Sequence, residues 1–238
     1  ASSTGIGTID STGSFNNENG FSIVSYTGTG SNGTIKHGLN SAPKMILIKQ
    51  RSGTRTWLFG HNSLGWDKYL LLSSTDTQGT SSSYFQSTAP TTSVFSVGTG
   101  NETNESGGTY IAYCFAEKKG YSKFGSYTGN GSTDGTFVYT GFKPAFVMIK
   151  SSSVAEAWWM FDSKRSESNV ANNGIIANGS NTEYSNSATF KIDMLSNGFK
   201  TRHGDAYANG SGQTYIYMAF AEEPLVANVG QSIPATAR

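Results

Sequence analysis

Short stretches in which apolar and polar residues alternate recur along the whole chain, separated by turns rich in glycine, serine and asparagine. Alternation with a period of two predicts β-strands, and stretches with the 3.6-residue period of a helix are hard to find. The predicted strands are Phe21–Tyr26, Lys44–Gln50, Arg55–Phe59, Tyr69–Ser73, Val94–Val97, Thr109–Ala116, Tyr121–Tyr127, Ala145–Lys150, Ala157–Phe161, Gly174–Ala177, Thr189–Leu195 and Thr214–Ala221, with further short elements after Gly33 and Gly135. The pattern therefore predicts an all-β fold.

Two stretches of the chain carry nearly the same pattern. SYTGTGSNGTIKHGLNSAPKMILIK (25–49) and SYTGNGSTDGTFVYTGFKPAFVMIK (126–150) agree at nine of 25 positions, at an offset of 101 residues. TYIAYCFAE (109–117) returns as TYIYMAFAE (214–222), with six of nine positions alike. A motif that opens a unit and a motif that closes it, both recurring, indicate a duplicated unit of about a hundred residues.

The duplication and the many short strands predict two tandem homologous antiparallel β-sandwiches of jelly-roll or Greek-key type. We expect copy A over residues 20–118 and copy B over residues 119–223. Residues 1–19 and 224–238 are expected to be extended arms. The alternative is that the sheets of the two copies fuse across the repeat into one larger sandwich.

The two closing strands are apolar on both faces, which predicts that both faces are covered. One interpretation is a central strand beneath long loops. The other is that the face with small residues packs against the sister copy or another subunit. The residues of that face are Tyr110, Ala112 and Cys114 in copy A, and Tyr215, Tyr217 and Ala219 in copy B.

Composition excludes several classes of protein. Charged residues make up 14% of the chain and the formal net charge is +1, so the basic footprint of a nucleic-acid-binding protein is missing. No apolar run approaches the 18 residues of a membrane-spanning helix, so membrane insertion is not expected. The single cysteine, Cys114, excludes an internal disulfide framework.

Candidate catalytic groups are sparse. None of the three histidines, His37, His61 and His203, has a second His or Cys at metal-ligand spacing. A catalytic His61 would need a nucleophile elbow, and no such motif is present, so a loop histidine with a local hydrogen bond is favoured. A glycoside hydrolase would need a carboxylate pair such as Asp162 with Asp193. We expect no catalytic residue, no metal and no cofactor.

The aromatic residues give a better indication of binding. Trp57 aligns with Trp159, which favours a core position for both. Trp66 lies between Gly65 and Asp67 in a predicted loop, where an exposed tryptophan is typical of a contact residue. A ring can stack on the apolar face of a sugar while neighbouring polar groups bind its hydroxyls. The candidate glycan contacts are Trp66, His61, Asp67 and Tyr69.

The chain also resembles a known family. The strings GFSIVSYTGTGS, HGLNSAPKMILIK, KYLLLSST and GGTYIAYCFAE, followed by the restart YSKFGSYTGNGS, are similar to a domain of unknown function found in large structural proteins of marine tailed bacteriophages. The resemblance covers roughly residues 20–222. It implies a virion protein, such as a fibre, decoration or other appendage, and brings no catalytic residues with it.

Three functions follow as hypotheses. The first is a non-enzymatic virion structural or surface protein, assembled in the host cytoplasm, whose partners are itself, as a homo-oligomer, and other virion proteins. A contribution to host-surface attachment is left open. The second is a lectin-like adhesin that binds a host surface glycan. The third is a hydrolase of surface polysaccharide.

Overall fold

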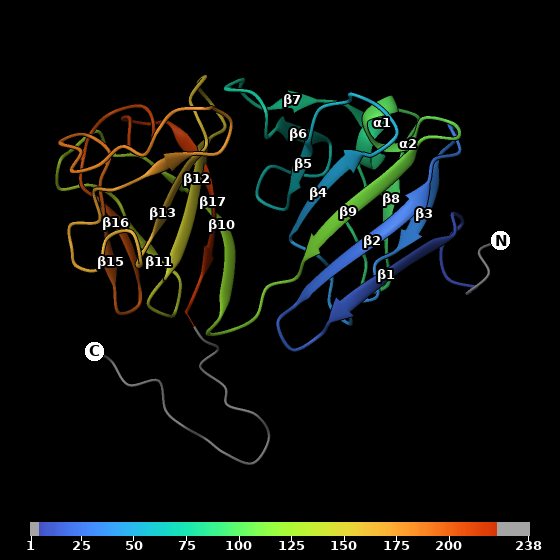
Figure 1. The fold of residues 1–238 in the computed structure, drawn as a ribbon, viewed down its shortest axis with the longest axis horizontal. Helices are drawn as coiled ribbons and strands as arrows, with labels where there is room; N and C mark the ends of the chain where they lie inside the picture. The colour runs from blue at the N-terminus through green and yellow to red at the C-terminus, as the bar shows by residue number, and fades with distance from the viewer. Residues whose placement is uncertain (1–4, 223–238) are drawn as a thin grey trace, which may run out of the picture. The chain divides into compact units, whose positions relative to one another are not determined.

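The computed structural model describes residues 5–222, and it is built almost entirely of antiparallel β-sheets (Figure 1). Contacts divide the chain into two compact units that meet at the junction between Glu117 and Lys118. We call the described residues before this junction unit 1 and those after it unit 2. No helix in residues 5–222 is long and apolar enough to cross a membrane.

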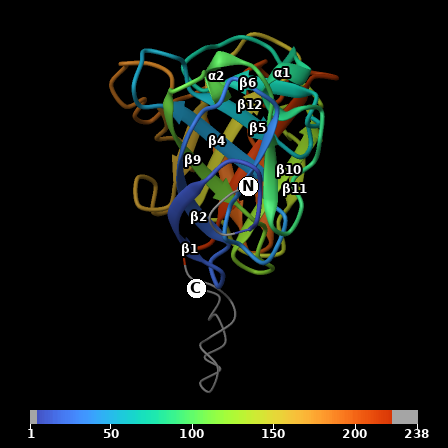
Figure 2. The ribbon, with the colours of Figure 1, turned by 90° about the vertical axis from the view of Figure 1, so that its right-hand side faces the viewer.

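Unit 1 contains a large sheet and a small one. The large sheet has the strand order β1-β2-β9-β4-β5-β6-β7, of which β1, β2, β9 and β4 lie side by side in Figure 2, and the small sheet pairs β3 with β8. The strands are β1 (Ser11–Asn16), β2 (Phe21–Thr27), β3 (Gly33–Lys36), β4 (Met45–Gln50), β5 (Leu58–His61), β6 (Lys68–Leu71), β7 (Gly79–Thr80), β8 (Val94–Val97) and β9 (Thr109–Phe115). Two single helical turns, α1 (Ser82–Phe85) and α2 (Asn101–Asn104), flank β8.

Unit 2 also contains a larger and a smaller sheet. Their strand orders are β10-β17-β12-β13-β14 and β11-β16-β15. The strands are β10 (Ser122–Thr128), β11 (Phe137–Tyr139), β12 (Phe146–Ser151), β13 (Trp159–Asp162), β14 (Ile175–Ile176), β15 (Ile192–Leu195), β16 (Gly198–Thr201) and β17 (Thr214–Phe220). Among the described residues no sheet combines strands of both units, so the alternative of one fused sandwich is wrong.

The closing strand of each unit is central in its larger sheet, as one interpretation of the sequence predicted. β9 lies between β2 and β4, and β17 lies between β10 and β12. The registers also correspond, because Tyr26 pairs with Tyr110 in unit 1 and Tyr127 pairs with Tyr215 in unit 2. The two rings of each pair stack, with centroids 5.2 Å apart in unit 1 and 5.1 Å apart in unit 2.

The interface predicted for the small-residue face of these strands is wrong, because that face forms the core of its own unit. Tyr110, Ala112 and Cys114 belong to one buried cluster with Ile35 and Phe95 of the small sheet. Small residues in a central strand leave room for the second sheet of the same unit to approach. The same holds for the residues of β17 that face inward in unit 2, namely Tyr215, Tyr217 and Ala219.

The predicted N-terminal arm is partly a strand. Ser11–Asn16 pairs with β2 along its whole length, and Ile9 forms a parallel bridge to Ile35 and is buried. Residues 1–19 are therefore not an extended arm throughout, because this segment covers the outer edge of β2. The predicted C-terminal arm, residues 224–238, lies outside the described residues.

The predicted alignment of Trp57 with Trp159 is also wrong, by one residue. β4 pairs Ile48 with Leu58, whereas β12 pairs Ile149 with Trp159, so Trp159 takes the place of Leu58. Both of these residues lie in the core of their unit. Because a shift of one residue exchanges the faces of a strand, Trp57 falls outside the core cluster, half-buried with its ring 6.1 Å from that of Tyr113.

Candidate functional site

The residue at the centre of the predicted glycan site is buried. Trp66 is 6% exposed and belongs to the core of unit 1, where its ring meets Phe85 edge-on at 5.2 Å. The chain reverses at Gly65, with φ of +89°, and a side chain at Gly60 would lie 2.9 Å from the Trp66 ring. The two glycines therefore let the ring turn inward, and the predicted exposure of Trp66 is wrong.

The other predicted contacts do not gather around Trp66. His61 follows Gly60 in β5, so its side chain lies on the opposite face of the strand from the Trp66 ring. Its Nδ1 accepts a hydrogen bond from the Ser63 backbone N–H at 3.1 Å. The Asp67 carboxylate lies 3.3 Å from the Lys68 ammonium, and the Tyr69 ring packs edge-on against Tyr84 at 4.7 Å. The structure thus does not place these residues around an exposed tryptophan: Tyr69 packs against the same core as Trp66, and His61 lies on the other face of β5.

A buried asparagine holds a loop in place in unit 1. Asn104 is 0% exposed, and its Oδ1 accepts a hydrogen bond from the Thr29 backbone N–H at 2.8 Å. Its Nδ2 donates to the carbonyls of Ser31 and Gly98, at 2.6 and 2.7 Å. One side chain therefore ties residues 28–32, between β2 and β3, to the end of β8. We call this arrangement the asparagine clamp of unit 1.

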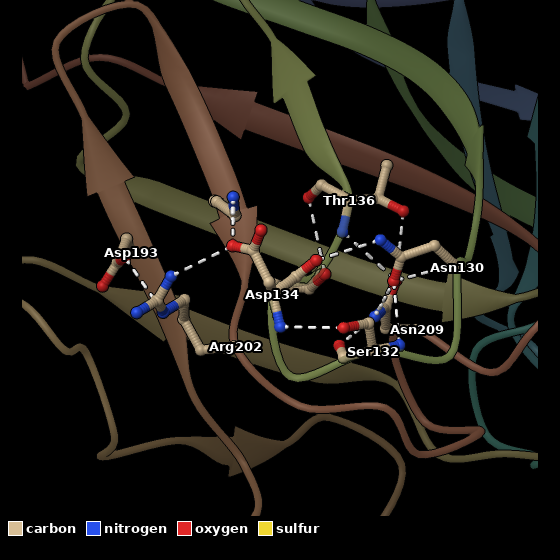
Figure 3. Close-up of polar contacts among 9 residues, drawn as sticks. Asn130, Ser132, Asp134, Thr136, Asp193, Arg202 and Asn209 are labelled. Carbon is tan, nitrogen blue, oxygen red and sulfur yellow. Dashed lines mark hydrogen bonds and ion pairs between the residues drawn. The ribbon is translucent and has the colours of Figure 1, made fainter.

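Unit 2 has its own asparagine clamp (Figure 3). Asn209, also 0% exposed, accepts hydrogen bonds through Oδ1 from the backbone N–H of Asn130 at 3.1 Å and from the Thr136 hydroxyl at 3.1 Å. Its Nδ2 donates to the Asn130 side chain at 2.8 Å and to the Ser132 carbonyl at 2.9 Å. The clamped loop, residues 129–136, is longer than its counterpart in unit 1.

Tyrosine hydroxyls support each clamp. Tyr26 donates to the Thr103 carbonyl and Tyr127 to the Ala208 carbonyl, each at 2.6 Å and each next to a clamping asparagine. Burial raises the pKa of Tyr26 and of Tyr127 well above the usual value of 10.0. Both hydroxyls therefore stay protonated and keep donating across the physiological pH range.

The longer loop of unit 2 carries a group of charges (Figure 3). The Asp134 carboxylate lies 2.6 Å from the Lys200 ammonium and 3.7 Å from the Arg202 guanidinium. The hydrogen bond from Lys200 lowers the pKa of Asp134. Arg202 also reaches Asp193, with its Nε 3.3 Å from Oδ2. These side chains form a chain of ion pairs along the outer side of β15 and β16.

A pocket of about 310 Å³ lies beside these ion pairs. It is lined by Thr133, Asp134, Val170, Lys191 and Arg202. The lining combines a carboxylate, two cations, a hydroxyl and one partly exposed apolar side chain. That combination suits a small polar ligand with both hydroxyl and charged groups, and pockets of this size are at the small end of ligand sites.

Comparison with known proteins identifies the family. The family described as "Domain of unknown function (DUF7483)" matches residues 1–224. The chain belongs to this family. No curated protein and no solved structure matches the chain.

The described part of this DUF7483 chain holds no group of three or more His, Cys, Asp or Glu side chains placed to bind a metal ion. The carboxylates considered for a hydrolase each have an arginine partner. Asp162 pairs with Arg165 at 2.9 Å and accepts backbone hydrogen bonds from the turn after β13, whereas Asp193 pairs with Arg202. The two belong to different sheets of unit 2.

Sequence reasoning missed the charged residues of the DUF7483 pocket, although a signal was present. Lys191 and Asp193 are two positions apart, as are Lys200 and Arg202, a spacing that places each pair on one face of an extended segment. Asp193 stands directly opposite Lys200 in the pairing of β15 with β16. Alternating charges on two neighbouring strand segments, joined by Asn197-Gly198, would have indicated a hairpin with a charged outer face.

Proposed function

We propose that this chain is a non-enzymatic structural protein, built from two copies of one β-sandwich, which forms part of the surface of a tailed-phage virion. The resemblance of its opening and closing motifs to phage structural proteins suggests the setting. The observation that carries the structural role is how both units use their buried polar groups. In each, a fully buried asparagine and two stacked tyrosines fix a loop, which makes the unit rigid.

The correspondence of the two units supports a gene duplication. The central strand, the stacked tyrosines and the clamping asparagine occur in both at matching positions of the strand order. Smaller contacts repeat as well. Tyr110 and Tyr215 each accept a hydrogen bond from a backbone N–H five residues earlier, at 2.8 Å in both cases. Recurrence of such specific hydrogen bonds favours descent from one ancestral sandwich over chance similarity.

Several properties suit the proposed assembly role. Low charge and many hydroxyl and amide side chains give a neutral surface that can form hydrogen bonds with neighbouring subunits. In unit 1 the large sheet ends at β1, a mostly exposed and polar edge strand whose outer backbone groups can pair with a strand of a neighbouring subunit. We therefore expect defined partners, namely further copies of this chain and other virion proteins, in an extracellular particle assembled in the host cytoplasm.

The proposal is tested by the mass of the chain in solution. Sedimentation velocity and native mass spectrometry over a wide range of concentrations are expected to give a homo-oligomer of fixed size. Peptides of this chain are also expected in gradient-purified particles from the culture that encodes it. A strict monomer at every concentration, together with its absence from such particles, would contradict the proposal.

A further inference from the structure

The outer face of the small sheet in unit 2 carries two exposed aromatic rings. In β11, Val138 points into the core, while Phe137 and Tyr139 point outward and are 44% and 64% exposed. The Phe137 ring lies over Gly198 of β16, where a side chain would come within 3.1 Å of it. The missing side chain therefore leaves room for the Phe137 ring. Exposed rings of this kind are suited to stack on an apolar face of a ligand.

Charged groups continue from these rings across the same face. Phe137 pairs with Lys200 of β16, and Lys200 pairs with Asp193 of β15. Arg202 and Asp134 extend the series to the pocket of about 310 Å³. The outer face thus runs from aromatic rings through paired charges into a polar pocket. We call this surface, made of Phe137, Tyr139, Asp134, Lys191, Asp193, Lys200 and Arg202, the outer face of unit 2.

The outer face carries more cations than carboxylates. Lys200 and Arg202 are paired with Asp134 and Asp193, which leaves Lys191 as a third cation. Within residues 5–222 no hydrogen bond or ion pair joins the Lys191 ammonium to another group. A ligand anion would therefore meet a cation that is not already neutralised, while Asp134, 80% exposed, can accept hydrogen bonds from hydroxyl groups.

We propose that the outer face of unit 2 binds an acidic saccharide. The C–H face of the sugar stacks on Phe137 and Tyr139, its hydroxyls donate to Asp134, and its carboxylate binds Lys191 and Arg202 in the pocket. The asparagine clamp keeps Asp134 in position, since Asp134 donates its backbone N–H to Ser132, whose carbonyl is held by Asn209. This inference goes beyond the structural role proposed above and does not depend on it.

The small sheet of unit 1 carries different side chains from the outer face of unit 2, and this difference supports the proposed binding site. Its two-stranded sheet has Thr34 and the buried Ser96 at the places of Phe137 and Lys200. At the place of Tyr139 it has Lys36, so none of these three residues is aromatic and only Lys36 is charged. The core residues beneath these positions, Phe95 and Phe199, are equally buried. The rings and charges of unit 2 are consequently not needed to build this kind of sandwich.

The test uses the full chain and a panel of uronic-acid and sialic-acid oligosaccharides, with neutral oligosaccharides and acetate as comparisons. Saturation-transfer NMR and calorimetry are expected to show binding of an acidic saccharide, with contacts to its C–H protons. Tyr139→Ala and Lys191→Gln are each expected to weaken binding about 10-fold, the loss of one stacking ring or one charge-assisted hydrogen bond. Phe15→Ala, which removes an exposed ring of unit 1, is the matched control and should bind as the wild type does.

Four results would overturn the proposal. These are no binding across the acidic panel, equal binding of the neutral oligosaccharides, displacement by acetate at the same concentration as the saccharide, and equal losses in Phe15→Ala and Tyr139→Ala. If Tyr139→Ala instead dissociates the oligomer while the saccharides do not bind, the outer face is a protein interface. Absence of saccharide binding would not contradict the proposed structural role, because that role is tested by the mass of the oligomer in solution.

Discussion

The two units of this chain share the same interior contacts and differ in the side chains on the outer face of the small sheet. Both hold a central closing strand, a stacked tyrosine pair and a buried clamping asparagine. At the edge of the small sheet they diverge. In unit 1 the backbone N–H of Gly98 binds the carbonyl of Tyr84, and in unit 2 the N–H of Arg202 binds the carbonyl of Lys191. The same backbone hydrogen bond therefore joins a glycine and a tyrosine in unit 1, and two cationic residues in unit 2.

This difference shows which features the fold requires. The Tyr84 ring packs on Tyr69 at 4.7 Å, and burial, with the Glu102 carboxylate beside it, raises the pKa of Tyr84 to about 12, so this part of unit 1 is filled by two tyrosine rings. In unit 2 the corresponding Lys191 lines an open pocket. Side chains that point outward can change freely, while the interior hydrogen bonds are retained because a buried polar group without a partner is costly.

The largest expected effect comes from removing a clamp. Asn209→Ala leaves the backbone N–H of Asn130 and the Ser132 carbonyl without their partner in a partly buried position, and should lower the free energy of unfolding of unit 2 by about 3 kcal/mol. Asn104→Ala should cost a similar amount in unit 1. Hydrogen exchange measured on peptides of β10 and β17, and of β2 and β9, assigns each loss to its unit.

The comparison would fail if either clamp variant changed exchange equally in both units. It would also fail if only one of the two asparagines mattered. Asn62→Ala, which removes an exposed asparagine side chain of unit 1, is the control and should leave exchange unchanged.

A smaller effect is expected from the tyrosine hydroxyls. Tyr26→Phe and Tyr127→Phe each keep the ring stack and remove one 2.6 Å hydrogen bond to a backbone carbonyl. Each should lower the free energy of unfolding of its own unit by about 1–2 kcal/mol. Denaturant unfolding of the two variants measures this. Unequal losses would indicate that one clamp depends on its tyrosine and the other does not.

The next smaller effect is expected from acidification, which should lower the stability of unit 1. His37 is 1% exposed, and burial lowers its pKa from the usual value of 6.5. Its Nδ1 accepts a hydrogen bond from the Leu39 N–H, so the neutral ring carries its proton on Nε2, which donates to the Thr91 carbonyl. The unfolded chain takes up a proton at the usual pKa and the folded chain only at lower pH. This contribution to stability is therefore complete above pH 6.5 and is lost as the pH falls through the lowered pKa.

Thermal unfolding between pH 7 and pH 5 checks this expectation. The melting temperature of unit 1 should fall with pH in the wild type, and the fall should be reduced in His37→Gln. An unchanged slope in His37→Gln would rule out His37 as the source. His203→Gln, in unit 2, serves as the control.

The smallest effect on stability is expected at the outer face of unit 2. Asp134→Asn removes the partner of an exposed ion pair, and such pairs contribute little. The melting temperature should stay unchanged. A clear loss of stability would mean that the ion pairs of β15 and β16 help to build the sandwich, in contrast to unit 1, which has none there.

Much of the strand pattern was predictable from the sequence, because half-buried strands alternate. Val94–Val97 is found as predicted, and Phe21–Tyr26 extends by one residue to Thr27. The edge strand Ser11–Asn16 was missed because its residues are almost all exposed, so no alternation marks it. The helical turns α1 and α2 are four residues long, too short to show a period.

The candidate site was harder to predict, for reasons that lie in the tertiary structure. The inward turn of Trp66 depends on Gly60, which looks like any other strand glycine in the sequence. The charges of the outer face come from positions 134, 191, 193, 200 and 202, and only the pairing of β15 with β16 and the clamped loop bring them together. Local patterns identify strands well, but they do not show which loop will lie beside which strand.

The only cysteine of the chain, Cys114, offers a practical consequence. It is 0% exposed in the core of unit 1, and burial raises the pKa of its thiol to about 12. The thiolate is the nucleophile that attacks an alkylating reagent, so this sulfur can react only after unit 1 has opened. The rate of alkylation therefore reports the opening of unit 1. Unit 2 has no cysteine and gives no signal in this measurement.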